Sequence, residues 1–176
     1  MRPACSIVLA VVLLAGCGGG DRLSGGDLPQ GPAHLRVSSP AFVDGSRLAP
    51  RYTCDGPGQE PPVTVGTTPA RTRELAVVVS DPDAPRGTFV HLTRYGIPPR
   101  GDGALDGGRV GRNSAGGTGW TPPCPPPGDD PHRYVWSVYA LADPSGLDAG
   151  AEPGRVADAL KHDVLASGTI TARYGR

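Results

Sequence analysis

The chain carries no net charge, because its 176 residues include 17 Lys and Arg and 17 Asp and Glu. A nucleic-acid-binding domain presents a basic surface, so this balance argues against nucleic acid as a partner. No C-x-x-C pair occurs, which argues against a structural zinc site. A G-x-S-x-G nucleophile elbow and an H-E-x-x-H motif, two frequent signatures of hydrolases, are also lacking. We therefore predict no metal, no cofactor and no enzyme activity.

Glycine and proline, in contrast, are abundant, with 27 and 21 residues. A high content of both is compatible with disorder. Two dense apolar runs, Leu75–Val79 and Tyr134–Leu141, are poor material for a disordered chain. The length suits one domain that can bury a core. We predict a globular domain with long loops rich in proline and glycine and with little helix.

The N-terminus resembles an export signal. Arg2 precedes the apolar run Ile7–Ala15, which is shorter than the roughly 18 residues that a membrane span needs. The following Leu14-Ala-Gly-Cys17 resembles the bacterial lipobox, in which the peptide is cut before the cysteine and the thiol receives a lipid. We predict a signal peptide at residues 1–16, a flexible tether at 17–33 and a domain at 34–176. Lipidated Cys17 would anchor the protein to the cell membrane on its extracytoplasmic side; an ordinary secretory signal is the alternative.

Four cysteines occur, and two of them belong to this N-terminal region. Cys5 would leave with the signal peptide and Cys17 would carry the lipid, so Cys54 and Cys124 remain. Outside the cytoplasm such a pair favours a disulfide. Two buried free thiols or a pair of metal ligands are the alternatives.

Alternating and apolar patterns predict mostly strands. Short or long strands are expected at Leu35–Val37, Leu75–Val79, Phe89–Ile97, Tyr134–Ala142 and Thr169–Tyr174. One helix is expected from Pro153, with Val156, Leu160 and Val164 on one face and Gly168 beyond its end. Strands separated by long loops favour an antiparallel β-sandwich with one C-terminal helix.

Candidate site residues follow or open these strands. Asp81 and Asp83 come directly after the first apolar run, His91 opens the next strand, and His132 and Tyr134 open the aromatic one. Loops and strand ends can present such side chains on a rigid scaffold. Two imidazoles, a phenol and two carboxylates would form a small polar pocket in which a protonated histidine accepts an anion. Each residue also has an ordinary structural role as an alternative, and spacing alone does not show that the segments meet.

Several short motifs occur in a fixed order between Ser38 and Arg176. They are Tyr52-Thr-Cys-Asp-Gly56, Val78-Val-Ser-Asp-Pro-Asp-Ala-Pro85, Phe89-Val-His91, Pro123-Cys-Pro-Pro126 and His132-Arg-Tyr134. In this order they resemble the phosphatidylethanolamine-binding protein (PEBP) family, most closely its bacterial Raf-kinase-inhibitor-like branch. The resemblance covers nearly the whole predicted mature chain.

The resemblance implies a β-sandwich with a small anion pocket. Its ligand-binding residues here would be Asp81, Asp83, His91, His132 and Tyr134, with the backbone around Cys124 and Pro125 at the rim. The function implied is a membrane-tethered module that binds a small anionic or phosphorylated ligand. An inhibitor or regulator of an exported protease or kinase ectodomain, acting through protein contacts, is the alternative, and a hydrolase is less favoured. One departure is Leu92, which stands where the family usually has a tryptophan that would form a wall of the pocket.

Overall fold

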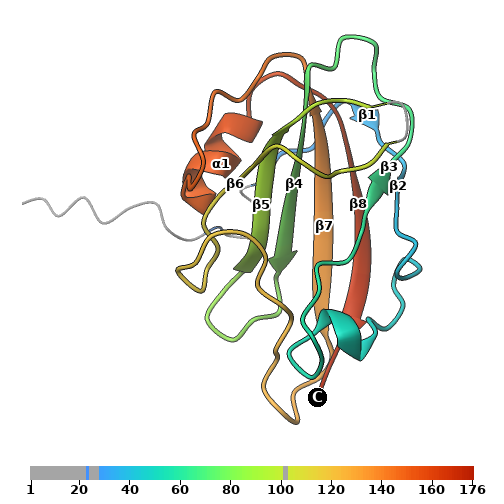
Figure 1. Ribbon diagram of the computed structural model, residues 1–176, viewed down its shortest axis with the longest axis vertical. Helices are drawn as coiled ribbons and strands as arrows, with labels where there is room; N and C mark the ends of the chain where they lie inside the picture. The colour runs from blue at the N-terminus through green and yellow to red at the C-terminus, as the bar shows by residue number, and fades with distance from the viewer. Residues whose placement is uncertain (1–22, 24–27, 101–102) are drawn as a thin grey trace, which may run out of the picture.

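The long strands form where the sequence shows apolar or alternating runs. The computed structural model, which describes residues 23, 28–100 and 103–176, contains one large and one small sheet (Figure 1). Its elements are β1 (Ala33–His34), β2 (Val37–Ser38), the 3-10 helix η1 (Pro50–Tyr52), β3 (Thr64–Val65), β4 (Glu74–Asp81), β5 (Phe89–Ile97), β6 (Arg109–Val110), β7 (His132–Leu141), α1 (Pro153–Leu160) and β8 (Val164–Tyr174). The predicted fold class, mainly strands with one late helix, is confirmed.

Strand β4 lies inside the large sheet, whose order is β1-β8-β7-β4-β5-β6. It runs antiparallel to both β5 and β7, and all eight of its residues are buried. A strand that packs on both faces has this continuous apolar sequence. The short β1 departs from the predicted antiparallel arrangement, because it pairs in parallel with β8 through Ala33 and Ala166. The large sheet is therefore mixed.

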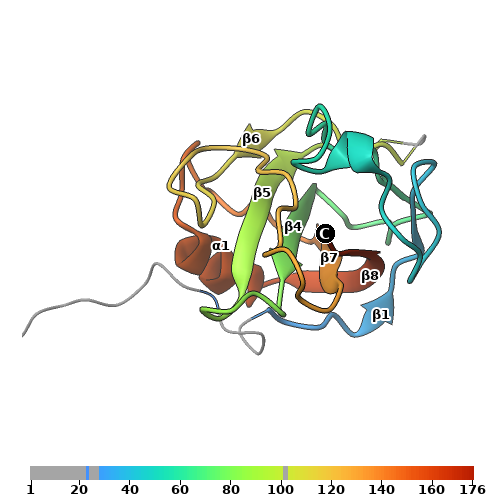
Figure 2. The same ribbon diagram turned by 90° about the horizontal axis from the view of Figure 1, so that it is seen from below.

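Apolar side chains pack on both faces of the large sheet. Figure 2 shows α1 and η1 on opposite sides of it. The face toward η1 and the small sheet β2–β3, here called the η1 face, includes Leu35, Leu48, Val77, Leu92 and Trp136. The face toward α1, here called the α1 face, includes Val78, Val90, Tyr139, Val156 and Leu160. The two clusters form a core of two layers with the sheet between them.

Helix α1 begins at Pro153 as predicted but ends earlier than predicted. It stops at Leu160, and Val164 already belongs to β8. Asp163 adopts a positive φ of 59°, a conformation that aspartate tolerates and that reverses the chain. Strand β8 then pairs with β7 from Val164 to Tyr174. Val164, which its spacing predicts to be helical, is therefore held in a strand by cross-strand packing.

The described part of the predicted tether contacts the domain. Leu23 is buried and Leu28 is partly buried against the α1-face cluster. The backbone N–H of Gly31 donates to the Ser167 hydroxyl at 2.8 Å. Cys17 and the predicted signal peptide lie outside the described residues. Among the described residues, no helix has the length and apolar character to cross a bilayer.

Candidate functional site

Three adjacent strands bring the predicted polar residues to one end of the sheet. Because β4 is antiparallel to its neighbours, its carboxyl end at Asp81 meets the amino ends of β5 and β7. His91 projects from the start of β5, and His132 and Tyr134 project from the start of β7. All four of these side chains are buried, and we call them the His/Tyr cluster. The structure thus places together segments whose proximity the sequence could not show.

A β-bulge turns His91 onto the η1 face. In the ladder with β4, Val90 and Leu92 pair with consecutive β4 residues, so His91 is the extra residue. A bulge interrupts the usual alternation of side chains between faces, and bulges often occur next to functional sites. The imidazole of His91 consequently lies 5.2 Å from the ring of Tyr134 and 6.0 Å from that of Trp120, between ring centroids.

The Asp81 carboxylate holds His132 in one orientation. Its Oδ2 lies 2.7 Å from Nδ1 of His132, and its Oδ1 accepts the backbone N–H of Asp83 at 2.9 Å. Nδ1 of His132 therefore carries a proton that it donates to the carboxylate. Nε2 faces away from Asp81, and the carboxylate of Asp129 lies 3.8 Å from it. Protonation of His132 would add a second N–H donor at Nε2.

His91 is fixed by the backbone of Thr121. Its Nδ1 donates to the carbonyl oxygen of Thr121 at 2.7 Å. Nε2 then carries the lone pair of the neutral ring, and this buried atom has no hydrogen-bond partner among the described residues. Burial lowers the pKa of His91 below its ordinary value. His91 therefore presents an unsatisfied acceptor to the cluster.

Tyr134 presents an unsatisfied donor. Its hydroxyl is buried, and no described residue pairs with it. Burial raises the pKa of Tyr134, and the negative charge of Asp81 raises it further. The hydroxyl thus keeps its proton and can donate a hydrogen bond. A buried polar atom without a partner is uncommon in folded proteins, and two of them on rings whose centroids lie 5.2 Å apart suggest that a bound molecule or water completes the site.

Asp83 lies beside the cluster, but its carboxylate is engaged elsewhere. It accepts from Nε of Arg133 at 2.9 Å, from Nη2 at 2.6 Å and from the backbone N–H of the same residue at 2.8 Å. These contacts from Arg133 lower the pKa of Asp83 to about 2. Asp83 is therefore a charged clamp on the start of β7, and it presents little free acceptor capacity to a ligand.

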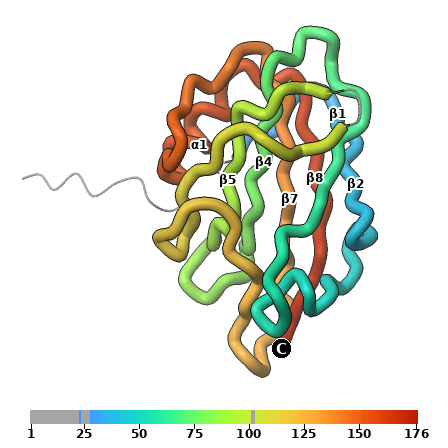
Figure 3. The backbone as a smooth tube through the Cα atoms, in the orientation of Figure 1, coloured from blue at the N-terminus to red at the C-terminus, as the bar shows by residue number. Residues whose placement is uncertain are grey.

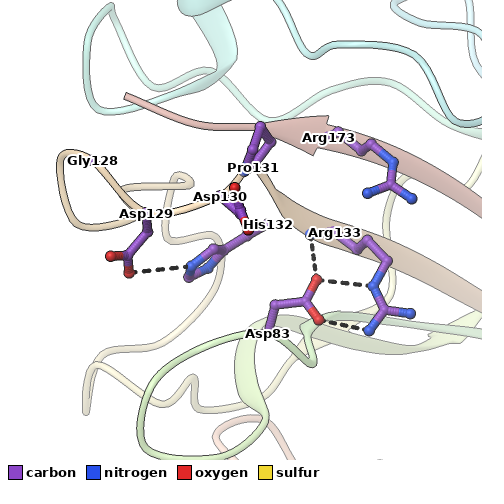
Figure 4. Close-up of a pocket in the computed structure, with 8 residues that line it drawn as sticks. All are labelled: Asp83, Gly128, Asp129, Asp130, Pro131, His132, Arg133 and Arg173. Carbon is purple, nitrogen blue, oxygen red and sulfur yellow. Dashed lines mark hydrogen bonds and ion pairs between the residues drawn. The ribbon is translucent and has the colours of Figure 1, made fainter.

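An open cleft of about 760 Å³ lies outside the cluster (Figure 4). Its lining residues are Asp83, Gly128, Asp129, Asp130, Pro131, His132, Arg133 and Arg173. Figure 4 shows the Asp129 carboxylate directed toward the His132 ring, and Asp83 directed toward Arg133. His132 is thus shared by the cleft and the buried cluster. An acidic loop at the cleft would weaken binding of an anion unless His132 is protonated.

Cys124 and Pro125, which are expected at the rim of the pocket, lie in the segment that leads into β7. Cys124 forms a disulfide with Cys54, with 5.3 Å between their Cα atoms, and Pro125 is buried. Sequence reasoning missed Trp120 and Thr121 in the same segment, because neither lies in a regular strand or belongs to a titratable pair. Leu92 is buried among the side chains of the η1 face, while Trp120 and Tyr134 supply aromatic contacts to His91.

The described residues contain no group of three or more His, Cys, Asp and Glu arranged to hold a metal ion. The cluster offers the donor hydroxyl of Tyr134, the neutral imidazole acceptor of His91, and the imidazole of His132, whose Nδ1 is held by Asp81. This set suits recognition of a small oxyanion by hydrogen bonds.

The lowered pKa of His91 predicts a dependence of stability on pH. Below the ordinary histidine value of about 6.5, the unfolded chain binds a proton at this residue that the folded chain does not. The free energy of unfolding should therefore fall by up to about 1 kcal/mol from this residue between pH 7.5 and 5.5. Urea unfolding of the wild type and of His91→Gln at both pH values measures this difference. An equal pH dependence in the two proteins would contradict the neutral buried state of His91.

The domain is mainly β, with a large mixed sheet and a small two-stranded sheet, and one end of the large sheet carries a buried cluster of two histidines, a tyrosine and a carboxylate. Residues 38–175 match the family described as Phosphatidylethanolamine-binding protein. The chain belongs to this family.

Relatives span nearly the same length. A UPF0098 protein of Methanothermobacter thermautotrophicus is 34% identical over 152 residues, which cover 81% of this chain and 99% of that protein. A Mycobacterium tuberculosis protein named "Putative lipoprotein LppC" is 35% identical over 173 residues, covering 85% of this chain and 84% of the relative. The crystal structure of Escherichia coli YbcL, titled a new member of the mammalian PEBP family, has a TM-score of 0.74 and 30% identity, and covers 82% of this chain and 99% of YbcL. The CT736 homologue of Chlamydia trachomatis also has a TM-score of 0.74, with 29% identity, and covers 81% of this chain and 98% of that chain.

Proposed function

We propose that the domain binds a small phosphate-like anion in the His/Tyr cluster. The observation that supports this most strongly is the pair of buried, unpartnered atoms, Nε2 of His91 and the hydroxyl of Tyr134. Leaving such groups unsatisfied costs free energy, which a ligand with matching donors and acceptors would recover. The family membership agrees with a ligand-binding role.

A phosphate group that carries at least one proton can both donate a hydrogen bond to this arrangement and accept hydrogen bonds from it. Its P–OH group would donate to Nε2 of His91, because burial favours the neutral ring. A charged oxygen would accept from the hydroxyl of Tyr134 and from Nε2–H of protonated His132. No arginine belongs to the cluster itself, so recognition would depend on desolvated hydrogen bonds rather than on a bidentate guanidinium. We therefore expect selective but modest affinity.

We also propose that the protein acts while tethered to a membrane through lipidated Cys17. The lipobox-like Leu14-Ala-Gly-Cys17 supports this, as does the name of the LppC relative. The ligand would then be met outside the cytoplasm, where the Cys54–Cys124 disulfide is also stable.

Titration calorimetry with inorganic phosphate and with phosphorylethanolamine tests the anion site. The chain from Gly18 to Arg176 is used, since it omits the lipid-bearing Cys17 but keeps Leu23, which packs on the domain. Binding should be saturable and should strengthen as the pH is lowered from 7.5 to 5.5, because a protonated histidine would offer the anion a positive charge and a second N–H donor. Tyr134→Phe should weaken binding about tenfold, the effect of one lost hydrogen bond.

Tyr139→Phe provides the matched control, because Tyr139 is a buried tyrosine of the same strand on the opposite, α1 face. It should bind phosphate like the wild type. Since Tyr134→Phe removes an unpaired buried hydroxyl, it should not destabilise the unliganded protein. The absence of heat at every pH, or an equal loss of affinity in both variants, would overturn the proposed site.

A further inference from the structure

The Cys54–Cys124 disulfide lies at the surface, and a basic side chain contacts it. Both cysteines are exposed. Nη1 of Arg176 lies 3.6 Å from Sγ of Cys124, and Nε of Arg176 lies 3.1 Å from the Asp55 carboxylate, which holds the guanidinium in place. A nearby guanidinium stabilises a thiolate, so Cys124 is the better leaving group of the two sulfurs.

The same disulfide is connected to His91 through a short segment of backbone. Thr121 lies three residues before Cys124, and it contacts His91 twice. Its N–H donates to the His91 carbonyl oxygen at 2.9 Å, and its own carbonyl accepts from Nδ1 of the ring at 2.7 Å. The position of Thr121 therefore determines which nitrogen of His91 faces the cluster.

Three links join this segment to the one that follows η1, and Figures 1 and 3 show the two running side by side near the C-terminus. Two are hydrogen bonds: the N–H of Cys54 donates to the carbonyl of Pro123 at 3.0 Å, and the indole N–H of Trp120 donates to the carbonyl of Gly58 at 3.0 Å. The third is the disulfide, which is the only covalent link between the two segments in the described chain.

We propose that Cys54–Cys124 is a site of thiol–disulfide exchange whose redox state sets the affinity of the anion pocket. The effect on binding rests on the proposed function. A dithiol reductant attacks Sγ of Cys54, and Cys124 leaves as a thiolate beside Arg176. The second thiol of the reductant then resolves the mixed disulfide. The reductant loses two electrons and two protons and becomes a disulfide, and the protein gains them as two cysteine thiols.

Loss of the covalent link frees the Thr121 segment and weakens the fixed tautomer of His91. Coupling between two sites is reciprocal. If reduction lowers the affinity for phosphate by some factor, bound phosphate must make the disulfide harder to reduce by the same factor. Phosphate binding and reduction of the disulfide are thus thermodynamically coupled.

The test compares oxidised and dithiothreitol-reduced protein under native conditions. Reduction should weaken phosphate binding about fivefold or more, reoxidation should restore it, and saturating phosphate should shift the reduction equilibrium toward the disulfide by the same factor. Equal affinity in the two redox forms would overturn the inference, and so would a disulfide that is reduced only when the protein unfolds.

A ligand-free measurement separates this inference from the proposed function. The ring ¹⁵N resonances of His91 report the hydrogen bond to Thr121, and they should change on reduction even in the absence of phosphate. If the oxidised protein does not bind phosphate, the anion site fails, whereas a shifted His91 resonance still supports the redox coupling. An unchanged His91 resonance overturns the coupling whatever phosphate does.

Substitution of Arg176 tests the leaving-group role. Arg176→Gln should slow reduction by dithiothreitol about threefold at low salt, because the departing thiolate loses its neighbouring charge. Arg71→Gln removes the same charge from an exposed residue that precedes β4, at the end of the strand opposite Asp81, and it should leave the rate unchanged. Equal rates in the two variants would overturn the role of Arg176.

Discussion

Replacing both Cys54 and Cys124 with serine is expected to lower the free energy of unfolding by about 4 kcal/mol, because the disulfide closes a loop across a sequence separation of 70 residues. A cross-link of this span restricts the unfolded chain far more than the folded one. Urea unfolding at pH 7 measures the change. The m-value should rise as well, since an unfolded chain without the cross-link exposes more surface.

Reduced wild-type protein and the single serine variants show whether the loss of stability comes from the missing disulfide. Wild-type protein reduced with dithiothreitol should unfold at the same urea concentration as the double serine variant, and single serine variants should do so as well. A loss below about 1 kcal/mol would show that the denatured chain is restrained by other means. Folding and disulfide formation stabilise each other, so the folded state makes the Cys54–Cys124 disulfide harder to reduce. The thiol–disulfide exchange proposed above therefore requires a strongly reducing dithiol.

Sequence patterns predict the inner strands well. The run at Leu75–Val79 is apolar on both faces, as expected for a strand that is covered on both sides. Phe89–Ile97 coincides with β5 to the residue. The local sequence is enough to predict these strands, because its apolar pattern matches the burial of the strand in the fold. The local sequence does not predict the parallel pairing of β1 with β8, since β1 has only two residues.

Prediction fails where tertiary pairing overrides local spacing. Val164 has the right spacing for the buried face of α1, yet it pairs with Leu141 at the start of the long β7–β8 ladder. The eleven residues of β8 gain more from that ladder than the residues after Leu160 would gain by lengthening a short helix. The predicted helix is consequently too long, although its start at Pro153 is right.

The candidate site is likewise predictable from the sequence only in part. Residue chemistry identifies Asp81, His91, His132 and Tyr134 as candidates, and the topology brings them together at one sheet end. Their orientation depends on the bulge at His91 and on the carbonyl of Thr121, neither of which leaves a pattern in the sequence. The partners of a side chain are set by distant segments, so they appear only in the structure.

Removing His132 is expected to abolish most of the anion affinity. His132→Ala deletes the imidazole whose Nε2 is not engaged by Asp81 and would donate to the anion, and hydrogen bonds that involve a charged group contribute up to about 3 kcal/mol. Phosphate affinity at pH 5.5 should therefore fall about 100-fold. The substitution also leaves the buried Asp81 carboxylate without its 2.7 Å partner, so it should cost about 3 kcal/mol of stability. Affinity alone would not separate a lost ligand contact from a damaged fold.

A second substitution at Asp81 separates the two effects. Asp81→Asn removes the buried charge, so the double variant His132→Ala/Asp81→Asn should regain most of the lost stability while its phosphate affinity stays low. In the single Asp81→Asn variant, the new amide nitrogen occupies the place of Oδ2 and donates to Nδ1 of His132. The neutral ring then carries its proton on Nε2 and donates to the anion without being charged. Phosphate binding should therefore persist at pH 7.5 and lose much of its pH dependence, as calorimetry at both pH values measures. A double variant that regains affinity together with stability would show that His132 supports the fold and does not contact the ligand.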